Sequence, residues 1–219
     1  MATKTAAKQS PKAAAGEIPV RQRLIEAAFS AFTERGYAET STLEIATRAR
    51  ASKRELYVEF GSKQDMLIAC ISERAKRFQM PADLAEPRDR ETLARVLTAV
   101  GAGHLREISD PAVITVFRLA IAEAVRTPEV AQALNEKGIE ASRGLLREVM
   151  TRACSNGLLS GEPAEMADRF VGLLWGNRML GLLLGVADRP GFPELAARAE
   201  AATAALLRLY PPETGETPV

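Results

Sequence analysis

The stretch that decides the fold is residues 41–63, STLEIATRARASKRELYVEFGSK. It holds two short helical patterns joined by a tight polar corner, and a third helix begins at its end. A serine followed three residues later by an acidic residue marks a helix start, because the two can cap the first turn. The spacing occurs three times: Ser41 with Glu44, Ser52 with Glu55, and Ser62 with Asp65. These starts predict three short helices with tight corners and exclude β-structure here.

The second short helix, residues 53–60, has the layout of a helix that reads DNA. Its apolar residues fall on one face, whereas Lys53, Arg54 and Tyr57 fall on another. A helix-turn-helix places the first residues of its second helix in the major groove, where Lys and Arg can donate to guanine O6 and N7. We therefore predict a helix-turn-helix over residues 41–60.

Helical periodicity continues on both sides of this stretch. Residues 20–35 carry an apolar stripe at three- and four-residue spacing, and Gly36 follows as a helix stop. Downstream, proline and glycine separate further amphipathic patterns, so helices are expected over residues 63–78, 92–108, 113–125, 127–154, 164–187 and 195–209. The predicted fold is all-α, with an N-terminal three-helix helix-turn-helix domain and a larger C-terminal helical domain.

Charge is distributed unevenly, although the net charge is only +1. Residues 1–63 carry 11 Lys and Arg against 7 Asp and Glu, whereas the remainder carries 18 against 21. The basic excess lies with the predicted helix-turn-helix, although an excess of this size also arises by chance. Residues 1–17 are rich in Ala and Lys and are interpreted as a basic arm, which could reach a minor groove or remain a solvated tail.

The cysteines predict free thiols in a reducing cytosol. Cys70 and Cys154 lie far apart in helical patterns, with no C-x-x-C motif or histidine partner, so we expect both to be buried and neither to bind a metal. The N-terminus lacks the apolar segment of a signal peptide. A cytoplasmic protein without cofactors is therefore expected.

Residues 170–187, FVGLLWGNRMLGLLLGVA, are apolar nearly all round. A membrane span is one interpretation, but the segment is short and Asn177 and Arg178 lie in its middle, where a charge in lipid is costly. The alternative is a helix buried within protein. Together with residues 195–209 it could form a four-helix bundle between two subunits, so we expect a homodimer and no membrane partner.

Residues 18–78 resemble the DNA-binding domain of the TetR (tetracycline-repressor-like) family of bacterial transcription regulators. The resemblance rests on an ordered set: Arg35-Gly36-Tyr37, Thr40-Ser41-Thr42, Ile45-Ala46, Ala49, Ser52-Lys53, Leu56-Tyr57, Phe60 and Ser62-Lys63. Residues 117–129, FRLAIAEAVRTPE, resemble more weakly the sensor domain of an AefR-like subset. The resemblance implies an all-α homodimer that binds a double-stranded DNA operator, usually as a repressor. A small-molecule effector would change the separation of the two recognition helices and release the operator.

On this basis the chain divides into a basic arm (1–17), a helix-turn-helix domain (18–78), a ligand-binding and dimerisation domain (79–210) and a flexible tail (211–219). The expected DNA contacts are Thr42, Arg50, Ser52, Lys53, Arg54, Tyr57, Val58 and Lys63. Three features depart from the family pattern. Arg50 stands where many members have glycine, Arg54 and Glu55 replace small residues, and Glu59 is acidic on a helix meant to face DNA. The capping spacing explains Glu55, whereas Glu59 would have to accept from cytosine or pair with a basic neighbour.

A ligand cavity is expected among the helices of residues 92–187. The candidate lining residues are His104, Phe117, Met150, Trp175, Asn177 and Arg178. Ordinary core packing is the simpler interpretation of Phe117, Met150 and Trp175, and a structural role is the simpler one for His104. Polar side chains in an apolar helix need partners, because burying them unpaired is costly.

The sequence leaves two alternative functions. An enzyme is the first, but the chain shows no Ser/His/Asp set, phosphate-binding loop or metal-ligand cluster, and it has a single histidine. A helical dimer that binds a ligand or protein but no DNA is the second. A non-enzymatic transcriptional regulator agrees best with the sequence.

Overall fold

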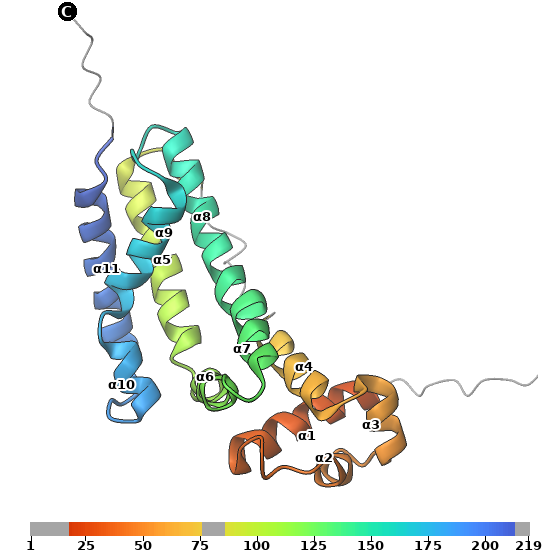
Figure 1. Cartoon of the computed structure of the whole chain (residues 1–219). Helices are drawn as coiled ribbons and strands as arrows, with labels where there is room; N and C mark the ends of the chain where they lie inside the picture. The colour runs from red at the N-terminus through yellow and green to blue at the C-terminus, as the bar shows by residue number, and fades with distance from the viewer. Residues whose placement is uncertain (1–17, 76–85, 213–219) are drawn as a thin grey trace, which may run out of the picture.

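The computed structural model describes residues 18–75 and 86–212, and within these ranges it is helical with no strand (Figure 1). Four helices form the N-terminal domain: α1 (Val20–Arg35), α2 (Thr42–Arg48), α3 (Lys53–Phe60) and α4 (Lys63–Ala75). The basic arm, the end of the helix expected over residues 63–78, the boundary near residue 78 and the tail from residue 213 lie outside the described residues.

Local capping fixes the short helices as the sequence predicts, with one difference. Ser52 Oγ accepts from the Glu55 amide and the Glu55 carboxylate accepts from the Ser52 amide, which completes a capping box at α3. At α2, Ser41 Oγ accepts from the Glu44 amide. The Glu44 carboxylate instead pairs with Arg48.

The corner of the helix-turn-helix bends at Arg50, whose φ is 50°. The Arg50 amide donates to the Thr47 carbonyl and the Ala51 amide donates to the Ala46 carbonyl, which is the hydrogen-bond pair of a Schellman motif. This motif requires a left-handed residue, a conformation that costs a side chain with a Cβ about 1–2 kcal/mol. Arg50 therefore strains the corner.

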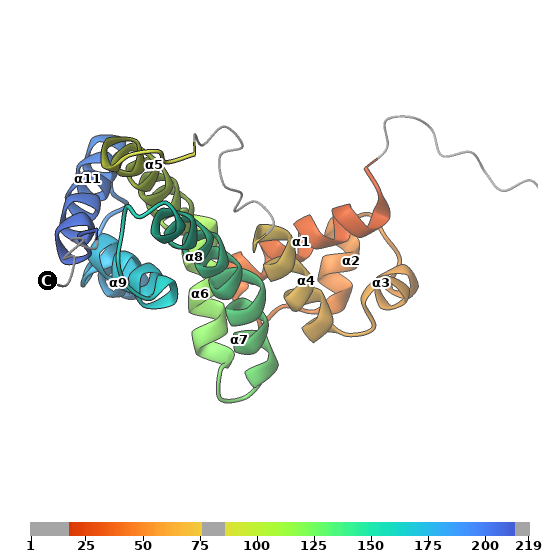
Figure 2. The same cartoon turned by 90° about the horizontal axis from the view of Figure 1, so that it is seen from above.

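The remaining helices form the C-terminal domain (Figures 1 and 2). They are α5 (Arg90–Ile108), α6 (Pro111–Glu123), α7 (Pro128–Leu134), the π-helical η1 (Asn135–Ile139), α8 (Glu140–Ser155), α9 (Pro163–Trp175), α10 (Arg178–Leu184) and α11 (Phe192–Leu209). Helix α9 packs on α8 and α11, and α11 packs on α5, whereas α6 lies across the end of this bundle next to the N-terminal domain.

The prediction of a single helix over residues 164–187 is wrong. Helix α9 ends at Trp175, Gly176 adopts φ 47°, and α10 starts at Arg178. The Arg198 guanidinium of α11 donates to the Leu174 carbonyl at 3.0 Å and to the Trp175 carbonyl at 3.1 Å. These bonds satisfy carbonyls that a continuing helix would have bonded.

The helix expected over residues 127–154 is interrupted by the wide turn η1. Among residues 18–75 and 86–212, no helix is long and apolar enough to cross a membrane. Both cysteines are free thiols, as predicted; Cys70 is buried, but Cys154 is only half-buried, so that part of the expectation is wrong.

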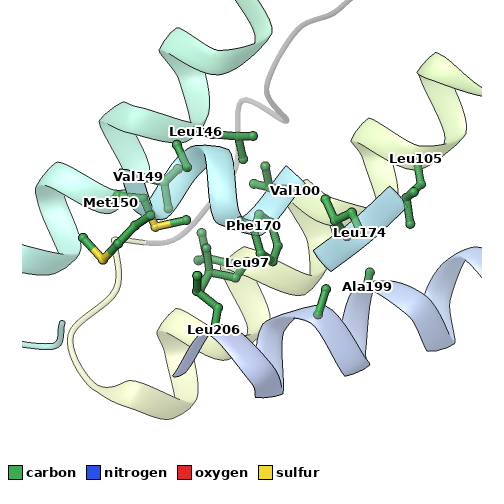
Figure 3. Close-up of a cluster of buried hydrophobic side chains, with 14 of the residues drawn as sticks. Leu97, Val100, Leu105, Leu146, Val149, Met150, Phe170, Leu174, Ala199 and Leu206 are labelled. Carbon is green, nitrogen blue, oxygen red and sulfur yellow. The ribbon is translucent and has the colours of Figure 1, made fainter. Parts of the chain in front are cut away.

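Two apolar clusters hold the helices together. One fills the C-terminal bundle, where side chains from α5, α8, α9 and α11 interdigitate, among them Leu97, Phe170 and Leu206 (Figure 3). The other lies beneath the helix-turn-helix and joins α1–α4 to α6 and α7. Burying such side chains supplies most of the stabilisation, at about 25 cal/mol per Å² of apolar surface.

Replacing Arg50 should test the strain at the corner. We expect the free energy of unfolding of Arg50→Gly to be about 1 kcal/mol higher than that of Arg50→Ala. Both variants lose the arginine side chain, but only glycine adopts positive φ without a Cβ clash. Urea unfolding followed by circular dichroism measures the difference. Equal stability of the two variants would show that the corner is unstrained.

Candidate DNA-binding surface and ligand cavity

Helix α3 presents to solvent a face on which two cationic side chains, Lys53 and Arg54, lie with Tyr57 and Val58. Its Leu56 and Phe60 side chains are buried, which fixes the rotation of the helix. Lys53 and Arg54 are consequently exposed, as are Tyr57 at 44% and Val58 at 76%. These four side chains are available to a partner as large as a DNA duplex.

Tyr57 joins residues of both helices of the motif. Lys53 Nζ lies 5.8 Å from the centroid of its ring, and Thr42 Oγ1 lies 3.4 Å from its hydroxyl oxygen. The structure therefore brings together Thr42, Lys53 and Tyr57, three of the residues proposed from the sequence as DNA contacts.

The acidic residues of α3 are each engaged within the protein. Hydrogen bonds from the Ser52 amide and hydroxyl hold the pKa of Glu55 below its usual value, so this carboxylate caps its own helix. Glu59 lies 3.9 Å from the Arg21 guanidinium, which also stacks over the Phe60 ring. A basic neighbour thus accounts for Glu59, one of the two explanations the sequence left open.

Lys63 and Ser52 are less available than the sequence suggests. Lys63 Nζ donates to the Ala38 carbonyl at 3.4 Å and lies 4.4 Å from the Tyr37 ring centroid, and partial burial lowers the pKa of its amine. The Ser52 hydroxyl is used in capping α3. By contrast, Arg50 is exposed at the corner.

Two further arginines support this surface and were not singled out from the sequence. Arg23 donates from Nε to the Ala49 carbonyl at 3.1 Å and so ties α1 to the corner. Arg48 pairs with Glu34 at 2.8 Å and with Glu44 at 2.6 Å. Only the Glu44–Arg48 spacing, typical of a helical ion pair, gave a signal in the sequence.

A cavity of about 190 Å³ lies between α4 and the C-terminal helices. Its lining is mostly apolar and comes from α4 to α10: Ile71, Arg74, His104, Glu107, Ile108, Val113, Val116, Phe117, Leu134, Gly138, Ile139, Ser142, Arg143, Val171, Trp175 and Met179. The structure brings together in this lining three of the residues predicted from the sequence as ligand contacts, His104, Phe117 and Trp175.

Three of the expected lining residues lie elsewhere. Met150 is fully buried in the core of the C-terminal bundle. Asn177 is exposed at the corner between α9 and α10, and Arg178 pairs with Glu194 at 2.8 Å. Asn177 and Arg178 were predicted to lie in one continuous apolar helix, but the chain turns between α9 and α10.

The polar centre of the cavity is a pair of buried side chains. His104 is 6% exposed and Ser142 is 4% exposed, and His104 Nδ1 lies 3.1 Å from Ser142 Oγ. The Trp175 ring meets the imidazole edge-on, with centroids 6.1 Å apart. Burial lowers the pKa of His104 to about 4, so the imidazole is neutral at physiological pH. Among the described residues, no group of three or more His, Cys, Asp or Glu could hold a metal ion.

His104 should make stability depend on pH. Between pH 6.5 and about 4 the unfolded chain binds a proton that the folded protein does not, so the free energy of unfolding should fall by about 3 kcal/mol as the pH drops through this window. Urea titrations across this range, with His104→Gln as the control, isolate the contribution. Because the chain has one histidine, its imidazole NMR resonances report the pKa directly, and titration near 6.5 would contradict the expectation.

Comparison with known proteins gives consistent results across the chain. Residues 24–70 match the family model of bacterial regulatory proteins of the tetR family. Residues 95–212 match the model of the C-terminal domain of AefR-like transcriptional repressors, which covers more than half of the chain.

Individual relatives agree with these matches. A TetR-family transcriptional regulator from Mesorhizobium loti is 27% identical, with a TM-score of 0.76 over 88% of this chain and 96% of that one. The flavonoid-responsive regulator FrrA is 26% identical, with a TM-score of 0.73 over 89% and 98%. The HTH-type transcriptional regulator YvkB of Bacillus subtilis is 23% identical over 76% of this chain and 85% of that protein. The chain belongs to the TetR family of transcriptional regulators and carries a C-terminal domain of the AefR-like type.

Proposed function

We propose that the protein binds an operator through the exposed face of α3 and that a small molecule in the cavity releases it, as in a ligand-controlled repressor. The observation that carries the proposal is the cationic face of α3, held in a fixed rotation by Leu56 and Phe60. A ligand-binding dimer that does not bind DNA would not require exposed cationic side chains on α3.

The roles of the residues follow from their positions. Lys53 and Arg54 begin α3, where recognition helices contact bases, and Val58 can meet a thymine methyl group. The hydroxyls of Thr42 and Tyr57 suit phosphate oxygens, as do the Arg50 guanidinium and the Lys63 amine. Ser52 acts by capping α3.

The cavity can influence the operator site through α4. Ile71 and Arg74 of this helix line the cavity, and α4 begins at Lys63, three residues after α3 ends. A ligand that displaces α4 would therefore move the recognition helix. The similarity to FrrA, which is flavonoid-responsive, supports control by a small organic molecule.

A homodimer is proposed from the apolar surface of the last helices. Several exposed apolar side chains belong to α9, α10 and α11 and their connections: Leu173, Leu180, Leu184, Val186, Phe192 and Leu209. A two-fold dimer through this surface would place two recognition helices about 34 Å apart or somewhat more, matching successive major grooves. We infer a cytoplasmic regulator without enzymatic activity.

Operator binding should depend on the face of α3. We expect Arg54→Ala to weaken operator binding about 5- to 100-fold if Arg54 contacts a base. Lys53→Ala should weaken operator binding by an amount that reflects the contact that Lys53 makes with the DNA. The measurement is fluorescence anisotropy with fragments selected from a random duplex library, and with the region upstream of the protein's own gene. The logarithm of the association constant should fall linearly with the logarithm of the salt concentration, with a slope of about −0.9 for each phosphate that the protein neutralises.

Arg95→Ala is the matched control, because Arg95 is an exposed arginine of α5 far along the chain from the helix-turn-helix. It should leave operator affinity unchanged. If no duplex is bound at low salt, the proposed function is wrong. If Arg95→Ala weakens binding as much as Arg54→Ala, the contact surface is not α3.

Dimerisation should depend on α10. Leu180 and Leu184 are exposed on this short helix, so Leu180→Glu with Leu184→Glu should convert the dimer to a monomer in light scattering at micromolar concentration. Val125→Glu, a similar change at an exposed apolar residue beyond α6, serves as the control and should remain dimeric. A monomeric wild-type protein would contradict the proposal.

A further inference from the structure

The wall of the cavity is apolar over most of its extent. Aliphatic and aromatic side chains from α4, α5, α6, α7, η1, α9 and α10 face it, including Ile108, Val113 and Phe117, and the indole of Trp175 lies beside the imidazole of His104. Transfer of an apolar group from water to such a wall is favourable, at about 25 cal/mol per Å². The body of a ligand here should therefore be apolar.

The His104–Ser142 pair places buried hydrogen-bonding groups in this mostly apolar wall. When His104 Nδ1 accepts, the Ser142 hydroxyl donates to it and its oxygen lone pairs can accept from a ligand. When the other tautomer donates from Nδ1, the same hydroxyl can donate to a ligand. The pair can thus match one ligand oxygen of either kind, a hydroxyl or a carbonyl.

The charged side chains at the lining do not favour an anion. Arg143 is engaged by the carboxylates of Glu140 at 2.9 Å and Asp168 at 3.2 Å. The Arg74 guanidinium stacks over the Phe29 ring, 4.1 Å from its centroid, and Glu107 adds a negative charge to the same lining. Burial keeps the His104 imidazole neutral. The two arginine charges of the lining are thus compensated by the carboxylates of Glu107, Glu140 and Asp168, so a neutral ligand matches the cavity better than a carboxylate, whose burial is costly.

The volume of the cavity indicates the size of a ligand that fits within it. A cavity of about 150 Å³ in another protein holds benzene, so the 190 Å³ here suits one substituted ring. The flat rings of Phe117 and Trp175 on the wall favour an aromatic ligand, because offset and edge-to-face ring pairs contribute about 0.5–1.5 kcal/mol beyond area burial.

We propose that the cavity binds a neutral one-ring aromatic compound through a hydrogen bond between its single hydroxyl or carbonyl oxygen and Ser142. The regulatory meaning of this binding rests on the proposed function, whereas the binding itself does not. Ser142 sits in the first turn of α8, directly after the wide turn η1, so a ligand held there touches the segment that follows α7.

Tryptophan fluorescence of the full-length protein tests the proposal, because the chain's one tryptophan, Trp175, lines the cavity. The probes are 4-ethylphenol, ethylbenzene and benzoate at neutral pH. We expect saturable quenching by 4-ethylphenol and at least tenfold weaker binding of benzoate, which has a similar size but carries a charge. Ser142→Ala should weaken 4-ethylphenol binding about three- to tenfold and leave ethylbenzene within twofold of the wild type.

The control variant is Ser109→Ala. Ser109 is also buried in the fold, but its hydroxyl donates to the Arg106 carbonyl and it does not line the cavity. It should bind 4-ethylphenol as the wild type does. If Ser142→Ala loses ethylbenzene as well, Ser142→Thr, which keeps a hydroxyl, must restore 4-ethylphenol binding.

Four outcomes would overturn the proposal: no quenching by 4-ethylphenol, benzoate binding as tightly as 4-ethylphenol, an unchanged 4-ethylphenol affinity in Ser142→Ala, or failure of the threonine rescue. The operator measurements are independent of this assay. Binding of 4-ethylphenol by a protein that binds no duplex would refute the proposed function and leave the ligand assignment standing. Operator binding without any 4-ethylphenol binding would refute the ligand assignment and leave the proposed function standing.

Discussion

The apolar cluster beneath the helix-turn-helix is completed by the C-terminal domain, and the placement of the recognition helix depends on this shared packing. Val116 and Leu119 of α6 and Val130 of α7 are buried in the same cluster as side chains of α1 to α4. Short helices such as α2 and α3 are marginal alone, so their geometry is held by what they pack against. The face of α3 that we propose to bind DNA is thus oriented with the help of α6 and α7, which lie next to the N-terminal domain (Figure 2) and also contribute residues to the cavity lining.

The cavity lies at the boundary between the two apolar clusters, so a ligand bound there would contact side chains of both. Val116 and Leu134 line the cavity and belong to the cluster of the helix-turn-helix, whereas Trp175 lines it from the cluster of the C-terminal bundle. The wide turn η1 borders the same space through Gly138 and Ile139, and π-turns of this kind occur frequently at functional sites. Close-packed interiors do not deform continuously, so a ligand here would favour one discrete arrangement of α4, α6 and α7.

Local signals in the sequence were sufficient for the helix starts and for the exposed face of α3. The serine caps, the stop at Gly36 and the apolar periodicity act over three or four residues and can be read directly. Contacts between residues far apart in the chain could not be predicted. At the break after Trp175 the carbonyl is bonded by Arg198, and Glu59 is paired with Arg21. The same limit explains why Met150 was placed in the cavity, since periodicity shows that a side chain is buried but not which space it faces.

The engaged carboxylates of α3 change what this surface offers to DNA. Glu55 is turned to the start of its own helix and Glu59 faces Arg21, whereas Lys53 and Arg54 are exposed at the N-terminal end of α3. Arg50 lies beside them in a conformation that glycine would adopt without strain. Backbone strain persists where the surrounding structure enforces it and is concentrated at functional sites. The strained position of this exposed cationic side chain supports the phosphate contact proposed above for Arg50, a contact that glycine could not make.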